Sequence, residues 1–296
     1  MENSARVVVT GMGAVTPVGN DVTTSWQNLK AGHSGIDRIT LFDPSMLETQ
    51  IAGEVKGFDS RKHFEAKDAR RLFRFVQLAV VAAREAIADA HLEINASNSE
   101  NIAIIIGSGV GGGMAIGDQF KILETKGARR VSPFFIPMML IDTAAAQVAI
   151  EFGIKGPNMA IVSACATGGN AIGEAAEMIK RGDVDVVVCG GTEACLSQLA
   201  IAGFNVMGVL SARNDEPMKA SRPFDATRDG MVMGEGAGIL VLEHEDRARA
   251  RRKNLRTSRR LRHERRCQSP RRPRRRRRRH RARDAVGAQA RQDATA

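Results

Sequence analysis

Short apolar runs alternate along the chain with longer segments whose apolar residues have helical spacing. The runs that we interpret as strands or extended segments are residues 7–10, 102–106, 157–163, 184–188 and 238–242. The segments that we interpret as helices are residues 23–31, 72–90 and 167–180. Glycines follow several of these elements, and we expect Gly11, Gly32, Gly182 and Gly190 to end them. This alternation predicts an α/β fold with parallel strand pairing and helices on both faces.

The pattern ends near residue 247, where arginine replaces the apolar residues. Of the chain's 44 Lys and Arg residues, 22 lie in residues 247–296, together with only three of its 33 Asp and Glu residues. The net charge of +11 therefore belongs to this segment, and the rest of the chain carries −8. A segment with so few apolar residues buries too little surface to offset its ordering entropy. We therefore divide the chain into a domain of residues 1–246 and an Arg-rich tail of residues 247–296 that we expect to be disordered.

Composition narrows the class of protein. With 296 residues, of which 43% are hydrophobic, the chain is large enough to bury a core. The N-terminus lacks the unbroken apolar stretch of a secretion signal, and no apolar run is long enough to span a bilayer. The four cysteines have no CxxC spacing, which gives no support for a zinc site or a disulfide framework. We expect a cytoplasmic protein with reduced thiols.

The segment around Cys165 has the pattern of a reactive nucleophile. An apolar run leads to small residues, and a helix is predicted from Thr167. A sharp strand-to-helix turn exposes a side chain, a helix N-terminus lowers the pKa of a thiol there, and backbone N–H groups can hold an oxyanion. Taken alone, a cysteine is more often a small buried residue, so the motifs around it decide between the two interpretations. We interpret Cys189 and Cys195, on or just after a predicted strand, as unreactive.

Several motifs between residues 6 and 245 occur in the order found in one enzyme family. They are Val8-Val9-Thr10-Gly11-Met12-Gly13, Ser132-Pro133-Phe134-Phe135, the segment 156–169 around Cys165, Gly190-Gly191-Thr192-Glu193-Ala194, Arg222-Pro223-Phe224-Asp225, and Asp229-Gly230 through Gly234-Glu235-Gly236-Ala237-Gly238. With these motifs the sequence resembles the elongating condensing enzymes of the thiolase superfamily, of the β-ketoacyl-[acyl-carrier-protein] synthase II type. The resemblance implies the N-terminal half of a thiolase-like fold, with a mostly parallel mixed sheet and helices on both faces.

The resemblance also implies an acyltransferase of fatty-acid biosynthesis. An acyl group would move from acyl carrier protein to Cys165, and malonyl carrier protein would then decarboxylate and condense with the thioester. Val110 and Phe204 would line the acyl pocket, and Phe135 would reach across a homodimer interface into the partner's pocket; ordinary core packing is the alternative for all three. No metal or resident cofactor is implied, because phosphopantetheine arrives on the acyl carrier protein. A polyketide ketosynthase is the alternative within the family.

The sequence lacks the family's other catalytic groups. In the family, two histidines and a lysine from the second half assist condensation. The histidines of this chain lie outside such motifs: His33, His63, His91, His244, His263 and His280. We therefore expect negligible condensation by this chain. One half of the fold would also expose the apolar surface that its twin covers, which predicts poor stability and aggregation.

The Arg-rich tail has two interpretations. Codons that fit residues 251–256, read one nucleotide later, can encode Gly-Ala-Lys-Ile-Tyr-Ala, and residues 259–266 allow Val-Gly-Tyr-Gly-Thr-Ser-Ala-Asp, both close to the family's continuation. The first interpretation is therefore a frameshift. The second is a nucleic-acid-binding arm, because the six arginines at residues 274–279 can bind phosphates, although only non-specifically without aromatic residues for stacking. Resequencing the DNA around codon 250 distinguishes the two.

Overall fold

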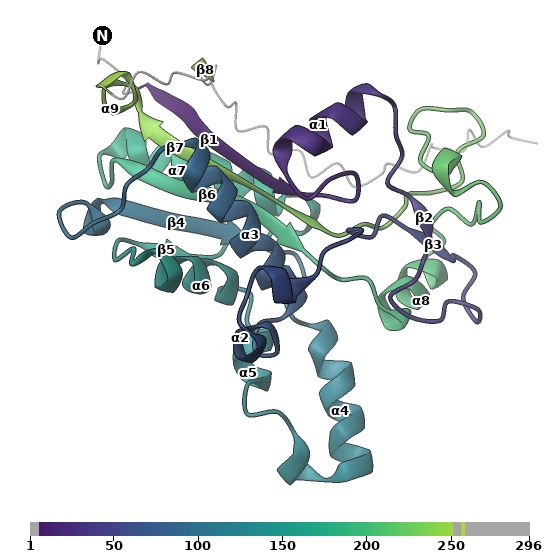
Figure 1. The fold of residues 1–296 in the computed structure, drawn as a ribbon. Helices are drawn as coiled ribbons and strands as arrows, with labels where there is room; N and C mark the ends of the chain where they lie inside the picture. The colour runs from purple at the N-terminus through teal and green to yellow at the C-terminus, as the bar shows by residue number, and fades with distance from the viewer. Residues whose placement is uncertain (1–5, 251–255, 258–296) are drawn as a thin grey trace, which may run out of the picture. The chain divides into compact units, whose positions relative to one another are not determined.

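The computed structural model describes residues 6–250 and 256–257. The strands of the main sheet in this part of the chain are β1 (Val7–Val15), β4 (Ile102–Gly107), β5 (Asn158–Met159), β6 (Val186–Glu193), β7 (Gly236–His244) and β8 (Arg256–Thr257). They lie in the order β5-β4-β6-β7-β1-β8 (Figure 1). Strands β1, β4, β5 and β6 run in one direction, and β7 and β8 run in the opposite one. The predicted mostly parallel mixed sheet is confirmed, with β7 inserted antiparallel between β6 and β1.

Helices connect the strands, and three of the described helices pack on the two faces of the main sheet. Their bounds are α1 (Val22–Lys30), α2 (Ala66–Ala69), α3 (Arg74–Asp89), α4 (Met114–Lys126), α5 (Phe135–Met139), α6 (Thr143–Phe152), α7 (Thr167–Arg181), α8 (Gln198–Val206) and α9 (Glu245–Ala250). Helices α3 and α6 cover one face, and α7 covers the other (Figure 1). A separate two-stranded sheet pairs β2 (Asp37–Arg38) with β3 (Ile51–Ala52). The predicted layers are therefore present.

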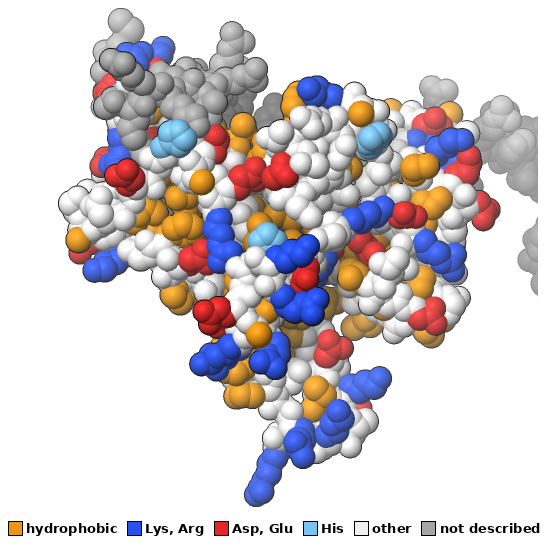
Figure 2. All heavy atoms as spheres, viewed as in Figure 1, with side chains coloured by type: hydrophobic (Ala, Val, Ile, Leu, Met, Phe, Trp, Pro, Cys, Tyr) orange, Lys and Arg blue, Asp and Glu red, His pale blue; other side chains and the backbone are white. Residues whose placement is uncertain are grey.

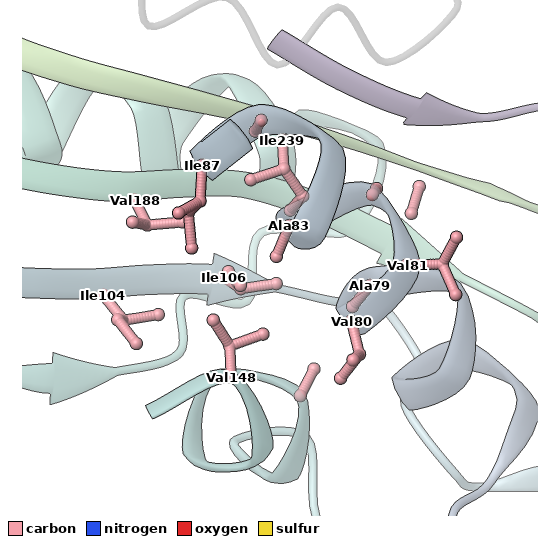
Figure 3. Packing of buried hydrophobic residues seen from close by; sticks show 14 of the residues in the cluster. Ala79, Val80, Val81, Ala83, Ile87, Ile104, Ile106, Val148, Val188 and Ile239 are labelled. Atoms are coloured by element: carbon pink, nitrogen blue, oxygen red, sulfur yellow. The ribbon is translucent and has the colours of Figure 1, made fainter. Parts of the chain in front are cut away.

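Alternate residues of β4 point to opposite faces of the sheet. Ile102, Ile104 and Ile106 join the hydrophobic cluster under α3 and α6, whereas Ala103 and Ile105 join the cluster under α7. This period of two is expected for a strand that is buried on both faces. Figure 3 shows the first cluster, in which side chains of α3 and α6 meet those of β4, β6 and β7. The core of the domain is therefore the sheet itself, covered on both faces.

Strand β1 continues through Gly11 and Gly13, where the sequence pattern predicts its end. A side chain at either position would overlap the backbone of α3, at the carbonyl oxygen of Ala86 for Gly11 and of Ala82 for Gly13. These glycines let the helix lie directly on the strand, and they do not break the strand. Strand β6 likewise continues beyond its predicted end, as far as Glu193.

Helix α3 also caps part of the edge of β1. The backbone N–H of Met12 donates to Asp89 (3.1 Å), and that of Ala14 donates to Glu85 (2.9 Å). Glu85 accepts a second hydrogen bond from the N–H of Val22, at the start of α1 (2.8 Å). Because β8 pairs with the neighbouring part of the same edge, carboxylates and a short strand together satisfy backbone groups of β1.

The described structure extends past the domain boundary that we predict at residue 246. Helix α9 crosses it, Ala248 is buried, and Arg247 pairs with Asp185 (3.1 Å) and Glu243 (3.6 Å). The first residues of the predicted tail therefore belong to the domain, and all described residues belong to one compact unit. Apart from β8, the rest of the tail lies outside the described residues, so its predicted disorder, the frameshift and the nucleic-acid-binding arm stay predictions.

Large hydrophobic side chains are exposed on the described surface. Phe224 is 96% exposed and Val206 is 91% exposed. Helix α4, which projects away from the main sheet in Figure 1, exposes Ile116, Phe120 and Leu123 at helical spacing. Figure 2 shows Lys and Arg side chains gathered over α2 and the far end of α4. The exposed hydrophobic residues agree with the expectation of uncovered apolar surface, and aggregation stays a prediction.

Candidate active site

Cys165 lies in a short turn between an extended segment and helix α7. The turn is the 3-10 helix Ala164–Ala166, and α7 begins at the next residue. Ala164 has a φ of 51°, a left-handed conformation that is uncommon and strained for a residue other than glycine. The Cys165 side chain is exposed. The sharp turn that the sequence predicts is therefore present, although only the β5 part of the predicted extended segment pairs with the sheet.

Side chains from the start of α7 hold this turn in place. The backbone N–H of Ser163 donates to the hydroxyl of Thr167 (2.9 Å), and the amide of Asn170 donates to the hydroxyl of Ser163 (2.6 Å). Thr167 itself is buried. The N-terminus of α7, a helix of 15 residues, brings its first-turn N–H groups and the positive end of its dipole next to Cys165. Such N–H groups can stabilise the oxyanion that forms on a carbonyl group when the Cys165 sulfur attacks it.

A cavity of 680 Å³ opens beside Cys165. It lies at the carboxyl ends of β1, β4 and β6 and the start of β7, the edge where α/β sheets commonly bind ligands. Seven of its lining residues are glycines: Gly107, Gly109, Gly168, Gly191, Gly234, Gly236 and Gly238. A side chain on Gly238 would have no neighbour within 4 Å, and one on Gly168 would meet only Gly191, at 3.6 Å. At Gly238 the missing side chain therefore leaves open space in the cavity.

The structure brings three of the four predicted site residues together. Cys165, Val110 and Phe204 all line the cavity, with Val110 40% exposed and Phe204 half-buried in α8. Phe135 is the first residue of α5, is half-buried, and is not among the described residues that line this cavity. The contact that we predict for Phe135 is with a second copy of the chain, so it stays a prediction.

Two glutamates, Glu193 and Glu235, also line the cavity, and the sequence pattern predicts no role for them. Glu235 is buried and accepts hydrogen bonds from the guanidinium of Arg74 (2.6 and 2.7 Å) and from the N–H of Val55 (2.9 Å). Glu193 is half-buried and accepts three hydrogen bonds from the loop that follows β4. Both residues lie in motifs that carry the family resemblance, and that is the only signal in the sequence that could have pointed to them.

A second thiol, Cys195, also lines the cavity. Burial, together with the negative charge of Glu193, raises the pKa of Cys195 to about 11. Burial raises the pKa of Cys189 far above the usual range for a thiol, and this cysteine lies in the sheet core. Both shifts keep the neutral thiol at physiological pH, which supports the interpretation of these two cysteines as unreactive.

None of the described histidines lines this cavity. They are spread over the domain and lie at His33, His63, His91 and His244. Burial and the charge of Arg84 lower the pKa of His63, which stacks on Phe58. The remaining two, in the tail, lie outside the described residues. Cys165 therefore has no described imidazole beside it in the cavity.

Comparisons with known proteins show the family to which the chain belongs. The profile of the family described as beta-ketoacyl synthase, N-terminal domain, matches residues 4–248. The chain is 51% identical over 255 residues to 3-oxoacyl-[acyl-carrier-protein] synthase 2 of Staphylococcus aureus (strain COL), and the match covers 86% of this chain. It covers 61% of that relative, so the chain spans less than two thirds of the length of the curated relatives that it matches.

Solved structures show the same fold. The crystal structure of a beta-ketoacyl synthase from Burkholderia phymatum STM815 superposes with a TM-score of 0.75 at 37% identity, covering 84% of this chain and 61% of that one. The complex AntDE:AntF, a type II PKS acyl-carrier protein with its ketosynthase bound to the hexaketide, gives a TM-score of 0.73 at 29% identity, covering 85% of this chain and 61% of that one. Sequence and fold agree that the chain belongs to the β-ketoacyl synthase family and contains its N-terminal, thiolase-like domain.

Proposed function

We propose that this chain carries out the acyl-accepting step of a β-ketoacyl-[acyl-carrier-protein] synthase, with Cys165 as the nucleophile. The observation that carries the proposal is the position of Cys165, which is exposed at the N-terminus of α7 and lines a cavity of 680 Å³. Val110 and Phe204 give this cavity apolar walls that suit an acyl chain. Membership of the family supplies the class of chemistry.

In this step the sulfur of Cys165 attacks the carbonyl carbon of an acyl thioester. A C–S bond forms to Cys165, the C–S bond to the phosphopantetheine thiol breaks, and that thiol leaves with the proton that Cys165 gives up. N–H groups at the start of α7 stabilise the oxyanion of the tetrahedral intermediate. The product is a thioester on Cys165, whose carbonyl stays electrophilic for attack by a carbanion.

The second step, decarboxylative condensation with a malonyl group, is proposed to be negligible in this chain. The family resemblance assigns two histidines and a lysine to that step, from a part of the fold beyond the matched residues 4–248. The chain spans 61% of the length of its Staphylococcus aureus relative, and no described histidine lines the cavity. Without these groups, the carbanion and the oxyanion of the second step lack their electrostatic support.

The acyl donor that we propose is an acyl carrier protein. The ketosynthase AntDE is found in complex with the acyl-carrier protein AntF, and this chain shares the fold of that ketosynthase. Among the described helices, none combines the length and the hydrophobicity that a membrane span requires. We place the protein in the cytoplasm, where its thiols stay reduced, and expect the homodimer of the family, with Phe135 at the contact.

The observations support fatty-acid elongation better than they support polyketide synthesis. Identity is 51% to the Staphylococcus aureus 3-oxoacyl-[acyl-carrier-protein] synthase 2, against 29% to the type II PKS ketosynthase AntDE. A linear acyl chain also needs only an apolar cavity, and Val110 and Phe204 provide apolar lining. We therefore propose saturated acyl thioesters as the substrate class.

Acyl transfer to the full-length chain tests this proposal. Incubation with dodecanoyl-pantetheine should add one dodecanoyl group, located at Cys165 by peptide mass spectrometry. Cys165→Ser should remove this adduct, whereas Cys195→Ser should retain it. Acylation that is spread equally over Cys165, Cys195 and Cys267, or that persists in the Cys165→Ser variant, would overturn the proposal. A parallel incubation with malonyl-pantetheine should give no condensation product.

A further inference from the structure

Glu193 connects the end of β6 to the glycine-rich loop beside Cys165. Its carboxylate accepts hydrogen bonds from the N–H of Gly109 (2.8 Å) and the N–H of Val110 (3.1 Å) on one oxygen, and from the hydroxyl of Ser108 (3.1 Å) on the other. The Ser108 hydroxyl in turn accepts from the N–H of Gly111 (2.8 Å). One carboxylate therefore fixes four consecutive residues of the loop, directly or through one hydroxyl.

The same loop lies against the turn that carries Cys165. A side chain on Gly109 would start 3.1 Å from the Glu193 carboxylate and 3.7 Å from the carbonyl oxygen of Ala164. The loop is thus held between Glu193 and the residue that precedes the nucleophile. Val110 donates its N–H to Glu193 and also forms part of the cavity wall. The position of this wall relative to Cys165 therefore depends on the Glu193 carboxylate.

We propose that Glu193 is a positioning residue, which holds the Val110 wall of the cavity and so determines how the rate of Cys165 acylation depends on acyl chain length. This inference rests on the proposed function, because it concerns the same acyl transfer. Glu193 does not exchange a proton or form a bond in that step: the donor thioester is still cleaved by the Cys165 sulfur. Its contribution is the geometry of the wall that the acyl chain meets.

Glu54 provides a matched control. One of its carboxylate oxygens accepts from the N–H groups of Thr40 (2.8 Å) and Leu41 (3.0 Å), and the other accepts from the hydroxyl of Thr40 (2.7 Å). This is the same set of two N–H groups and one hydroxyl that Glu193 binds. Glu54 is buried but does not line the Cys165 cavity. Loss of Glu54 therefore reproduces the loss of three hydrogen bonds without moving the Val110 wall.

Glutamine at position 193 should rescue the geometry. Its amide oxygen can accept from Gly109 and Val110, and its NH₂ group can donate to the hydroxyl of Ser108. Alanine removes all three bonds and leaves two backbone N–H groups without this partner. The pair Glu193→Gln and Glu193→Ala therefore separates the position of the loop from the negative charge.

The experiment measures the rate of Cys165 acylation by acetyl-, hexanoyl- and dodecanoyl-pantetheine in the full-length chain, read by intact mass spectrometry. In Glu193→Ala the ratio of the dodecanoyl rate to the acetyl rate should change by about fivefold or more relative to the unmodified chain. Glu193→Gln and Glu54→Ala should keep the original ratio. Ser108→Ala, which removes one of the three bonds, should change the ratio in the same direction by less.

The measured ratios decide whether Glu193 has a positioning role. If Glu193→Ala and Ser108→Ala both keep the original ratio, or if Glu54→Ala changes it equally, Glu193 has no positioning role. If Glu193→Ala does not fold, as judged by circular dichroism, the Ser108→Ala ratio decides alone. Failure of the proposed function has a different signature: the unmodified chain would then acquire no acyl group at Cys165 from any of the three thioesters.

Discussion

Glycines lie at the contact between β1 and α3 and again around Cys165, with opposite consequences. In β1, the missing side chains of Gly11 and Gly13 let a helix lie against the strand. In the cavity, the missing side chain of Gly238 leaves space that no neighbouring element of the described chain fills. At Gly11 and Gly13 the missing side chains bring two elements together, and at Gly238 the missing side chain keeps a volume open.

The neighbour of a glycine therefore decides what the glycine does. Close packing around Gly13 contributes to the stability of the domain, because a helix backbone occupies the place of its side chain. Open space around Gly238 contributes little to stability and can accommodate a ligand. Stability and acyl transfer should accordingly respond to different substitutions.

The largest expected effect is on the alkylation rate of Cys195, the second thiol of the cavity. Burial and the charge of Glu193 raise the pKa of Cys195 to about 11, and only the thiolate reacts with iodoacetamide. At about pH 8 the alkylation of Cys195 should be about a thousandfold slower than its plateau, and it should rise about tenfold per pH unit towards pH 11. Peptide mass spectrometry of the folded chain measures this rate. A plateau below about pH 9 would contradict the assigned environment, and urea-unfolded chain is the control, with an ordinary thiol pKa of about 8.5.

The next largest effect is the loss of stability expected from a side chain added at the contact between β1 and α3. Gly13→Ala should lower the free energy of unfolding by about 3 kcal/mol, because its methyl group would overlap the carbonyl oxygen of Ala82 and force strand and helix apart. Urea denaturation followed by circular dichroism measures the change. Gly117→Ala, in α4, is the control: its side chain would meet nothing within 4 Å and should stabilise the helix slightly. Equal stability of the two variants would show that β1 and α3 are not in close contact.

Arg74→Ala should cause a smaller loss of stability, and it tests whether α3 also supports the cavity. Arg74, on α3, pairs with Glu235 at 2.6 Å, and the Glu235 side chain is 1% exposed. Arg74→Ala should cost about 2 kcal/mol of unfolding free energy, less than a fully buried pair would, because Arg74 remains in part exposed. Adding Glu235→Gln should restore part of the loss, since no buried charge then lacks its partner. If the double variant is less stable than Arg74→Ala alone, charge burial is not the cause.

The smallest effect on stability is expected in the open region. Gly238→Ala should change the free energy of unfolding by less than about 0.5 kcal/mol, because nothing lies within 4 Å of the added methyl group. It should slow dodecanoyl transfer to Cys165 about twofold and leave acetyl transfer unchanged, because only a long chain occupies the narrowed volume. Denaturation and acylation are measured on the same preparation. A stability loss as large as that of Gly13→Ala would remove the distinction between the two regions.

Local patterns in the sequence predict much of the fold. The apolar run of β4 is buried on both faces, and the helix that follows Cys165 ends at Gly182, which adopts a φ of 80°. The turn at Cys165 could also be predicted, because small residues between an apolar run and a helix are a local signal. Such features depend on residues that are close together along the chain, so the sequence shows them directly.

Features that depend on distant residues could not be predicted. Glycine disfavours strands on propensity alone, which predicts that β1 and β6 end at their glycines. The contacts of Gly13 with α3 and of Gly190 with the backbone at Gly238 reverse this preference, and nothing near either glycine signals them. Glu193 likewise binds Ser108, 85 positions earlier in the chain. Only the folded structure shows these pairs.

The carboxylates of Glu85 and Asp89 on the edge of β1 also bear on how the sheet could grow. An incoming strand would need the N–H groups of Met12 and Ala14, which already donate to these two side chains. Displacing them would break these two hydrogen bonds and place two acidic side chains beside the incoming strand. Fibril-like extension through this edge is therefore disfavoured.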